Sequence, residues 1–480
     1  MKTEKIIDVF ILQGTDEETA KNMMVMKDPL VSRVGVVGGN IRASKTWHQI
    51  ANQTTAEYTM VYLSHQYIQM GPLSLERMVD VIEVTGAPLV YSDRWKRPAE
   101  GARKDAPVID YQAGSLRDDF DFGSVLFLRT SSLKKAVTLM KADYQAAGLY
   151  DFRLKITEEA LPVRIPEFLY TEVELDARKT GERLFDYVDP RNRQSQIEME
   201  QACTEYLKET GAFLDAPYPT LDFDKESFPV EATVMIPVRN RIRTIGDAIR
   251  SALAQVTTFS YNVFVVENGP ECHSTDGTTE LIDEIAATDA KLVHIVPTRD
   301  DLRVGGSWNT CIRDPRCGRF VVQLDSDDVY SGPDTLQKMV DTFREQQCAM
   351  VIGAYMLTDI NLQPLPPGKI DHREWTDDNG RNNALRINGL GAPRAFFTPV
   401  VRQLMMPNVN YGEDYALGLA ICRTWRIGRL YDAVYNCRRW DDNSDGDLDI
   451  DKENRNNLYK DRIRTWELLR RRALNAQTNK

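Results

Sequence analysis

The segment Val321–Tyr330 constrains this chain most, because an apolar run there delivers three carboxylates within four positions. The apolar residues are typical of a buried parallel strand, and Ser331–Pro333 ends it before a helical stretch begins. Asp325, Asp327 and Asp328 therefore lie at the carboxyl end of the predicted strand, the edge where open α/β sheets bind ligands. Charges so close together repel one another unless a cation or hydrogen-bond donors intervene.

A divalent metal is the natural counter-ion for these three acids. Carboxylate oxygens suit Mg²⁺ or Mn²⁺, and Mg²⁺ is typically held by one or two carboxylates together with the phosphates of a substrate. Asp325, Asp327 and Asp328 are thus candidate metal ligands. The alternative from the motif alone is a solvated acidic turn, because short motifs also match by chance.

Length and composition narrow the class of protein. At 480 residues the chain predicts roughly two to three domains. Its 42% hydrophobic and 27% charged residues are typical of a globular protein with a substantial core. The net charge of -11 argues against nucleic acid as a partner, since binding phosphates needs extended basic patches.

Cysteine and histidine usage argue for a cytoplasmic protein without a zinc site. The seven cysteines include no Cys-x-x-Cys pair, as expected in a reducing compartment. The five histidines show no ligand-like spacing. The apolar run Ile6–Leu12 contains Asp8 and is too short for a signal peptide core, and no stretch has the roughly 20 apolar residues that span a bilayer.

Strands and helices alternate through both halves of the chain, which predicts helix-covered, mainly parallel sheets. The expected strands of the first half are Ile6–Leu12, Val34–Val37, Tyr58–Leu63, Leu89–Tyr91 and Val125–Leu128, with a helix at Leu73–Val84. Asp215–Phe228, which contains Pro217, Pro219, Asp222 and Asp224, has linker composition, and the expected linker is residues 216–230. In the second half the expected strands are Thr233–Pro237, Asn262–Val266, Leu292–Val296 and the strand that ends in the acids, with helices at Arg243–Gln255 and Glu280–Thr288.

The two halves repeat one order of landmarks, which indicates a duplication. Each half has a tryptophan, an apolar strand, a Gly-Pro break and a helix that contains Met-Val-Asp; these are Trp47, Gly71-Pro72 and Met78–Asp80, and Trp308, Gly332-Pro333 and Met339–Asp341. Further on, Gly148–Phe152 parallels Gly412–Tyr415, which pairs Asp151 with Asp414. The alternative is that any two α/β domains share such landmarks.

Residues 232–445 resemble the GT-A domain of family 2 glycosyltransferases, on four stretches that occur in the order typical of the family. The stretches are Ile236–Asn240, Val265–Gly269 with Thr275–Thr278, the Asp-x-Asp motif at Leu324–Asp328, and Gly412-Glu413-Asp414. The resemblance implies two tandem GT-A-like (Rossmann-like) α/β domains and a nucleotide-sugar donor, with a UDP-sugar the favoured choice. It also implies transfer of a hexosyl or N-acetylhexosaminyl group with inversion, to a glycan or lipid-linked acceptor.

The resemblance also implies roles for individual residues. The nucleotide-sugar-binding residues would be Pro237, Arg239, Glu267, Asp276, Arg303, Asn309, Asp325, Arg439 and Trp440, and the metal, Mn²⁺ or Mg²⁺, would be held by Asp327, Asp325 and Asp328. Glu267 stands where the family usually has Asp, and Asn436–Trp440 departs from Gln-x-x-Arg-Trp by an Asn in the Gln position. Asp276 could instead be a turn or helix-capping residue, and Trp440 part of a structural strand.

The catalytic acids implied by the resemblance are Glu413 and Asp414, with Asp414 as the base that takes the proton of the incoming hydroxyl. An N-cap and first-turn acid is the structural alternative for this pair. The other classes to distinguish are a sugar nucleotidyltransferase, which would need a Gly-rich basic loop that Val238–Thr244 lacks, and a non-catalytic carbohydrate- or nucleotide-binding module.

The sequence thus predicts a degenerate, non-catalytic GT-A-like domain at 1–215, a linker at 216–230, and a catalytic domain with a C-terminal helix at 231–480. The first half is expected to be inactive because Ser64–Tyr67 stands at its metal position. The basic and apolar residues of Leu458–Ala473 allow two interpretations, a packed helix or a peripheral membrane contact.

Overall fold

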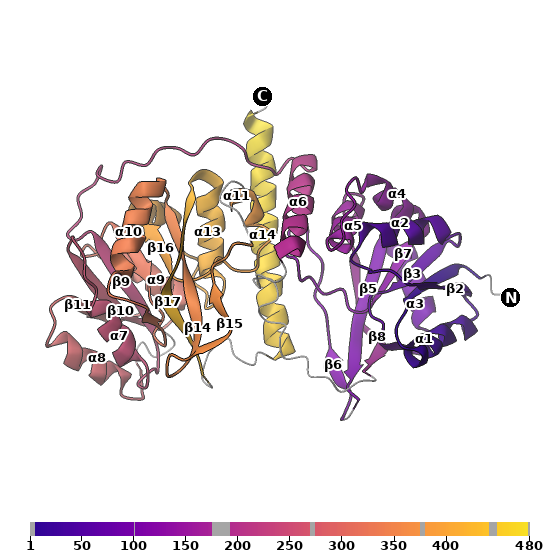
Figure 1. Cartoon of the computed structure of the whole chain (residues 1–480), viewed down its shortest axis with the longest axis horizontal. Helices are drawn as coiled ribbons and strands as arrows, with labels where there is room; N and C mark the ends of the chain where they lie inside the picture. Colours follow the sequence, from indigo (N-terminus) through magenta and orange to yellow (C-terminus); the bar gives the residue numbers. More distant parts are fainter. Residues whose placement is uncertain are drawn as a thin grey trace. The chain divides into compact units, whose positions relative to one another are not determined.

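The computed structural model describes residues 5–99, 101–174, 193–268, 274–374, 380–440 and 449–478. The chain divides into two compact units (Figure 1). Unit 1 comprises residues 1–187, 191–213 and 448–480, and unit 2 comprises residues 188–190 and 214–447. Each unit is a β-sheet with helices packed on it, so the predicted α/β class with two tandem domains is confirmed.

Unit 1 contains an 8-stranded sheet in the order β2-β1-β3-β7-β5-β8-β4, with β6 paired to β5. Its elements are β1 (Ile7–Leu12), α1 (Asp16–Asn22), η1 (Met23–Lys27), β2 (Val31–Val37), α2 (Ser44–Gln53), β3 (Tyr58–Tyr62), β4 (Tyr67–Met70), α3 (Ser74–Thr85), β5 (Leu89–Arg97), β6 (Lys104–Ala106), β7 (Val125–Arg129), α4 (Thr130–Leu139), α5 (Gly148–Ile156), β8 (Val163–Val173), α6 (Arg193–Glu209) and α14 (Ile450–Thr478). The five strands and the helix predicted for this half are all present.

Unit 2 contains a 9-stranded sheet in the order β11-β10-β9-β12-β16-β14-β17-β13, with β15 paired to β14. Its elements are β9 (Ala232–Val238), α7 (Ile245–Leu253), β10 (Tyr261–Glu267), α8 (Thr278–Ala286), β11 (Leu292–Ile295), α9 (Val304–Arg313), β12 (Phe320–Gln323), β13 (Val329–Tyr330), α10 (Thr335–Gln346), β14 (Met350–Asp359), β15 (Pro364–Ile370), α11 (Gly380–Asn383), β16 (Arg394–Phe397), α12 (Thr398–Leu404), α13 (Glu413–Thr424) and β17 (Ile427–Arg439).

The two sheets share one topology. The order that begins at β2 in unit 1 matches, strand by strand, the order that begins at β10 in unit 2, and matched neighbours are parallel or antiparallel alike. Strand β11 is an additional edge strand of unit 2. The remaining pairs agree as well: β5 and β14 run antiparallel to β7 and β16, and parallel to β8 and β17. The strand register therefore supplies a residue-by-residue correspondence between the units.

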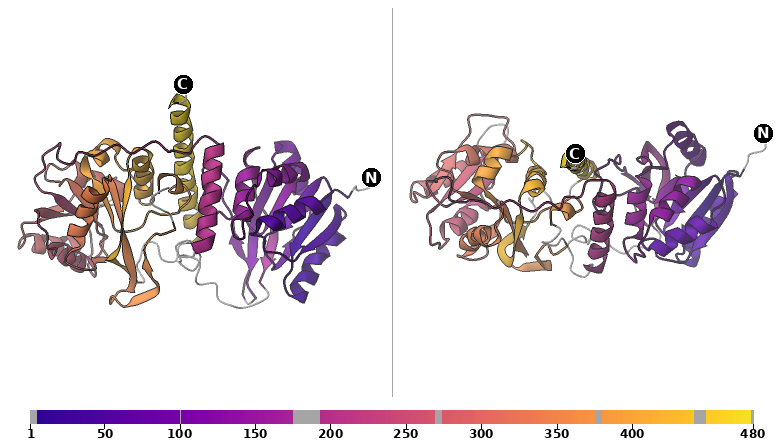
Figure 2. Two further views of the ribbon diagram at one scale, coloured as in Figure 1. Left: turned by 45° about the horizontal axis from the view of Figure 1, so that its top comes forward. Right: turned by 90° about the horizontal axis from the view of Figure 1, so that it is seen from above.

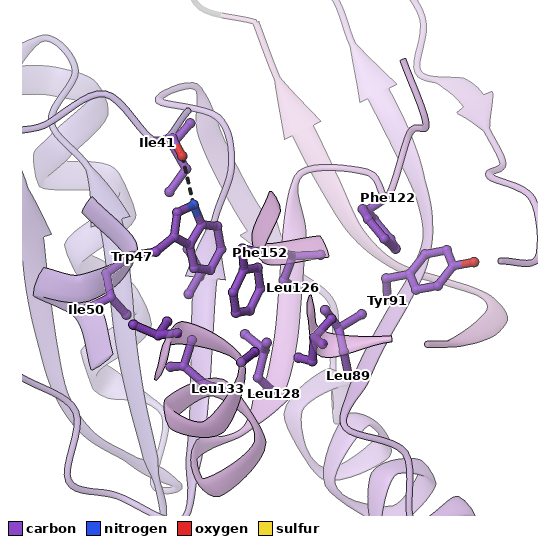
Figure 3. Packing of buried hydrophobic residues seen from close by; sticks show 14 of the residues in the cluster. Ile41, Trp47, Ile50, Leu89, Tyr91, Phe122, Leu126, Leu128, Leu133 and Phe152 are labelled. Atoms are coloured by element: carbon purple, nitrogen blue, oxygen red, sulfur yellow. Dashed lines mark hydrogen bonds between the residues drawn. The ribbon is translucent and has the colours of Figure 1, made fainter. Parts of the chain in front are cut away.

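Both sheets are mixed, whereas the sequence predicts mainly parallel sheets. The difference arises at β7 and β16, which lie mid-sheet and run antiparallel to the strands on both sides. The alternation of strands and helices indicates parallel strands but does not reveal a strand that enters the sheet in reverse. The core of unit 1 consists of two clusters, one on each face of its sheet. Figure 3 shows the cluster in which Trp47 stacks on Phe152 at 4.0 Å between ring centroids.

The C-terminal helix α14 packs on unit 1, so its predicted place in the catalytic domain is wrong. Asp461 is fully buried and accepts from the Ser115 hydroxyl at 2.8 Å, while the Gly114 amide donates to the Thr465 hydroxyl at 2.9 Å. Near its end, the Asn475 amide donates to the carbonyl oxygen of Phe213, just after α6, and the two helices lie side by side (Figure 2). A helix so distant in sequence from its partners gives no local signal of where it packs.

This packing also bears on the expectation of a membrane contact through α14. Lys460, Arg464 and Arg471 are buried, so these cations face protein rather than lipid. Arg462 and Arg470 remain on the exposed side, together with Trp466, which is 61% exposed. Within the described residues, no helix is both long and apolar enough to cross a membrane.

Candidate active site

Three parallel neighbours in unit 2, β10, β9 and β12, bring their carboxyl ends to one edge of the sheet. Glu267 pairs with Val238 at the ends of β10 and β9, and the acids after β12 follow on the same edge. Pro237 lies one residue before the end of β9, and the Arg239 guanidinium lies 3.5 Å from the carbonyl oxygen of Asn268. The structure therefore gathers the predicted nucleotide loops and the acidic turn along one edge.

Glu267 is tied into the protein instead of facing an open site. Its side chain is fully buried and accepts from the Thr279 hydroxyl at 2.8 Å, from the Ser274 amide and from His294 Nε2 at 3.1 Å. Burial alone would raise the pKa of Glu267, but these hydrogen bonds hold it below its usual range. The carboxylate thus anchors the loop that enters α8, a role that the sequence does not predict.

Asp276 has the turn and capping role that the sequence leaves open. Its Oδ1 accepts from the amide and the hydroxyl of Thr278, at 3.1 and 2.6 Å, and its Oδ2 accepts from the Ile242 amide at 3.1 Å. The Asn240 side chain adds a second link by accepting from the Thr275 amide at 2.8 Å. These bonds fasten the loop after β9 to the loop after β10.

Asp325 lies two residues beyond β12, where the strand motif predicts it. Both of its carboxylate oxygens accept from the Gln323 amide nitrogen, at 2.8 and 2.9 Å, and its own backbone amide donates to the Tyr435 hydroxyl at 3.0 Å. Burial, with the charge of nearby Asp327, raises the pKa of Asp325 despite the proximity of Arg394. A cation at this position would relieve that repulsion.

Asp327 meets the residues that follow β17. The Trp440 indole nitrogen lies 3.4 Å from Asp327 Oδ2, and the Arg241 guanidinium lies 3.9 Å from the same oxygen. The Trp440 ring is also 4.9 Å from the Arg243 guanidinium, an arrangement favourable for a cation–π contact. The Trp440 indole and the Arg241 guanidinium therefore approach one carboxylate of the acidic turn, and Arg243 lies against the Trp440 ring.

The third acid, Asp328, is buried and hydrogen-bonded to the protein backbone. It is 4% exposed, and its Oδ1 accepts from the Arg438 backbone amide at 2.7 Å. Burial and the neighbouring acids raise the pKa of Asp328 well above its usual range. Arg438 also donates to the carbonyl oxygen of Asp327 and pairs with Asp247 at 3.1 Å, whereas Arg439 lies opposite Asp359 in the β14–β17 pair.

The first turn of α13 carries the predicted catalytic pair, and the two acids differ sharply. Asp414 forms an ion pair of 2.8 Å with Arg394, whose positive charge lies near Asp325 as well. Glu413 is buried, and its Oε2 has no hydrogen-bond partner among the described residues. Burial, with the charge of Asp414, raises the pKa of Glu413 to about 8. The two neighbouring acids therefore differ in their surroundings: Asp414 is paired with a guanidinium, whereas Glu413 is buried.

Arg303 and Asn309, predicted to contact the donor, both lie against the loop before α13. The Asn309 side chain exchanges two hydrogen bonds with the Met406 backbone, at 2.8 and 2.9 Å, and the Arg303 amide donates to Asn408 at 2.8 Å. Gly305 makes this close approach possible, because a Cβ there would lie 1.9 Å from the Pro407 carbonyl oxygen. The amide group of Asn309 thus positions α13 through the backbone.

The acidic turn fits a divalent metal through two of its three carboxylates. Within the described ranges, no three His, Cys, Asp or Glu side chains converge as a complete ligand set. Mg²⁺ or Mn²⁺ bound with a diphosphate needs only one or two protein carboxylates, which Asp325 and Asp327 can supply. Asp325 and Asp327 are close enough for the charge of one to raise the pKa of the other, as expected of a site built for a cation.

Sequence reasoning missed three residues that organise this site. Gln323 holds Asp325, Arg394 pairs with Asp414, and the Tyr435 hydroxyl accepts from the Asp325 amide. Arg394 and Tyr435 are far from the acids in sequence and belong to no motif. Gln323 gave one available signal, because it is a polar residue within an otherwise apolar strand.

Comparison with known proteins identifies the class of unit 2. Residues 233–399, which lie wholly within this unit, match the family model described as glycosyl transferase family 2. This segment of unit 2 is therefore similar to family 2 glycosyl transferases. No curated protein matches the chain.

Solved structures with similarity to this chain include TarS from S. aureus, at 19% identity and a TM-score of 0.34, covering 44% of this chain and 37% of TarS. A shorter TarS structure, residues 1-349 in complex with UDP-GlcNAc, has 18% identity and a TM-score of 0.37, covering 50% of this chain and 72% of that one. The mannosyltransferase PcManGT from Pyrobaculum calidifontis, in complex with GDP-Man and Mn²⁺, has 17% identity and a TM-score of 0.34, covering 60% and 86%. The chain thus spans just over a third of the TarS chain.

Proposed function

We propose that unit 2 transfers a sugar from a UDP-sugar donor to a glycan or lipid-linked acceptor, with inversion at the anomeric carbon and with Mn²⁺ or Mg²⁺ as cofactor. The observation that carries the proposal is the ion pair of Asp414 with Arg394, which places a candidate base near Asp325 of the acidic turn. The family 2 match supports the same class of reaction.

In this mechanism Asp325 and Asp327 hold the metal, and the loops after β9 and β10 hold the nucleotide. The metal, when bound with the diphosphate, offsets the negative charge that grows on the leaving group. Arg241 and Arg243, which lie beside Trp440 at the same turn, are placed to meet phosphate oxygens. The hexosyl or N-acetylhexosaminyl group then lies between this turn and α13.

Asp414 acts as the base in a single displacement. One of its oxygens, Oδ2, is engaged by Arg394 at 2.8 Å, which leaves Oδ1 to accept the proton of the incoming hydroxyl. Removing that proton as the hydroxyl attacks stabilises an oxocarbenium-like transition state. One base suffices for inversion, so Glu413 is assigned a supporting position in the first turn of α13.

We also propose that unit 1 is a non-catalytic copy that arose by tandem duplication. The strand register aligns Asp325, Asp327 and Asp328 with Leu63, His65 and Gln66, so unit 1 has no carboxylate at the metal positions. Its Ser64–Gln66 turn is instead fastened to α1, because the Asn22 amide donates to the Gln66 carbonyl oxygen at 2.9 Å. Without metal ligands, such a unit would bind acceptor or stabilise the protein.

A thermal-shift screen tests the proposed function. The full chain is heated with UDP-glucose, UDP-N-acetylglucosamine or GDP-mannose, each with Mn²⁺ and with a chelator, because a ligand that binds only the native state raises its stability. A Mn²⁺-dependent shift with a UDP-sugar is expected for the wild type and not for Asp327→Ala. Mn²⁺-dependent release of UDP from the same sugar nucleotide then separates an enzyme from a binding module, which would show the shift without turnover.

A further inference from the structure

Arg394 connects the two halves of the candidate active site. Its guanidinium pairs with Asp414 Oδ2 at 2.8 Å, and its backbone amide donates to Gln323 Oε1 at 3.1 Å. Gln323 in turn donates from its amide nitrogen to both carboxylate oxygens of Asp325. A continuous chain of polar contacts therefore runs from the metal side of the site to its base.

The duplicated topology shows what unit 1 has at the same strand positions. Tyr58 of β3 pairs with Arg129 of β7, and Phe320 of β12 pairs with Phe397 of β16, which sets the registers equal. Counting along these strands, the equivalents of Gln323, Asp325 and Arg394 are Val61, Leu63 and Leu126.

A backbone hydrogen bond aligns the helices independently. The Ser44 amide of α2 donates to the Tyr144 carbonyl oxygen at 2.8 Å, and the Gly305 amide of α9 donates to that of Val409 at 3.1 Å. Four residues on from the two acceptors, α5 and α13 begin at Gly148 and Glu413.

Two tyrosines, each two positions after the start of its helix, confirm this helix register. The Tyr150 hydroxyl donates to the Leu116 carbonyl oxygen and the Tyr415 hydroxyl to that of Ala384, both at 2.6 Å. Asp414 therefore corresponds to Leu149. The pairing of Asp414 with Asp151 that the sequence suggests is wrong by two residues.

All four polar residues of the network, Gln323, Asp325, Arg394 and Asp414, thus have apolar counterparts in unit 1. Val61 and Leu126 are buried in its hydrophobic core, against which Leu63 and Leu149 pack. Leu126 is labelled in Figure 3. Residues that serve the fold were kept in both units, as Trp47 and Trp308 on α2 and α9 illustrate. Gln323 and Arg394 are instead present only in the unit that has the acids. This is expected if they serve the site and not the sheet.

We propose that Arg394, supported by Gln323, is a positioning residue of the transfer reaction: it fixes Asp414 with one oxygen free for the acceptor proton and links that base to the metal ligand Asp325. The inference rests on the proposed function of unit 2. A guanidinium at this depth is favourable only beside carboxylates, since an unpaired buried charge is costly. With the acids absent from unit 1, Leu126 is the residue that packs best there.

Steady-state kinetics of the full chain test the inference. The assay follows Mn²⁺-dependent UDP release from the UDP-sugar with the largest thermal shift. Arg394→Met is expected to lower kcat by about 100-fold, the cost of misplacing a catalytic group, while the donor KM changes by less than about threefold. Arg394→Lys, which keeps the charge, is expected to have a kcat between those of the wild type and Arg394→Met. If Arg394→Met does not fold, the kcat of Arg394→Lys is compared with that of the wild type instead.

Arg94→Met in unit 1 is the matched control. Arg94 is also a strand arginine with ion pairs, to Asp121 at 2.9 Å and Glu172 at 3.3 Å; it is more buried than Arg394 and lies outside the site. Its kcat should equal that of the wild type even if its melting temperature falls. This inference alone would be overturned if the wild type turns over and Arg394→Met has the same kcat. It would also be overturned if the kcat of Arg394→Lys is no higher than that of Arg394→Met. A wild type inactive with every nucleotide sugar would overturn the proposed function and this inference with it.

Discussion

At the scale of single residues, the first turn of α13 shows how two adjacent acids acquire different roles. Glu413 is buried and carries a pKa raised to about 8, whereas Asp414 is paired with Arg394 and lies 20% exposed. A general base must be ionised at the working pH and within reach of the acceptor. Position in the helix alone would treat the two acids alike; the neighbouring guanidinium distinguishes them.

The division of labour between metal ligand and base gives a first prediction. Asp327→Ala and Asp414→Asn should both reduce UDP release by at least about 100-fold. Asp327→Ala should also lose the Mn²⁺-dependent thermal shift with the donor, because the metal carries the diphosphate. Asp414→Asn should retain that shift. Near-normal turnover by Asp414→Asn would show that another group takes the proton.

A buried acid in unit 1 gives a prediction on pH and stability. Asp151 is 1% exposed, and neither carboxylate oxygen has a hydrogen-bond partner in the described part of the chain. Burial raises the pKa of Asp151 from 3.8 to about 7, with Glu205, Glu209 and Glu158 adding to the shift. Because the folded-state pKa is the higher one, unit 1 loses stability as pH rises from about 4 to 7, and the loss is complete above pH 7.

Asp151→Asn should therefore stabilise unit 1 at pH 8, by an amount on the order of a few kcal/mol, and much less at pH 4. Melting temperatures of the full chain at the two pH values provide the measurement. Asp105→Asn, at an exposed position of β6, is the control and should be neutral at both. An equal effect of Asp151→Asn at pH 4 and pH 8 would contradict the burial argument.

At the scale of elements, the contact between two helices is built differently in the two units. In unit 1 the glycine is on α5, where a Cβ on Gly148 would lie 2.1 Å from the Ser44 amide of α2. In unit 2 the glycine is on the partner helix, where Gly305 of α9 leaves room for Glu413 on α13. The two helices thus approach closely in both units, but the glycine that allows it is on α5 in unit 1 and on α9 in unit 2. Only the glycine on α9 leaves room for an acid at the start of α13.

Gly305→Ala is predicted to destabilise unit 2 by about 1–3 kcal/mol, because its Cβ would meet the Pro407 carbonyl oxygen, which is backbone and cannot rotate away. Gly246→Ala in the first turn of α7 is the matched control. There the nearest atoms belong to the flexible Arg250 side chain, at 3.0 Å, and alanine should stabilise by about 0.5–1 kcal/mol. Calorimetric melting of the two variants checks the opposite signs.

Much of the fold was predictable from the sequence, because its strands are short apolar runs between turn residues, as at Tyr58–Tyr62 and Phe320–Gln323. The acidic turn and the pair on α13 were predictable because their chemistry is local in sequence. Arg394 was not, since its partner Asp414 is twenty positions away and only the antiparallel insertion of β16 brings it to the site. The burial of Glu267 also escaped prediction, because it depends on His294 of the next strand.

At the scale of the whole molecule, the two units are not consecutive segments, since the chain returns to unit 1 with α14 after completing unit 2. Asp461 of α14 lies fully buried within 2.8 Å of both the Ser115 hydroxyl and the Arg464 guanidinium. Gln112 and Pro107 add contacts from the same loop of unit 1, to Leu458 and Asn454. Removal of α14 would therefore expose apolar and charged groups of unit 1 that its own strands do not cover.

Truncation after Asp447 is accordingly predicted to lower the melting temperature of unit 1 while unit 2 keeps its Mn²⁺-dependent shift with a UDP-sugar. The site residues of unit 2 precede residue 441, and the Asp414–Arg394 and Asp327–Trp440 contacts lie within that unit. A shorter truncation that removes residues 477–480 is the control, because it retains Asn475 and its bonds to Gly211 and Phe213. Hydrogen exchange of the Val108–Tyr111 backbone reports on unit 1 directly, and its protection should fall only in the longer truncation. If protection at Val108–Tyr111 survives that truncation while the donor-dependent shift disappears, α14 supports the catalytic domain and not unit 1, and the assignment of the helix made from its contacts is wrong.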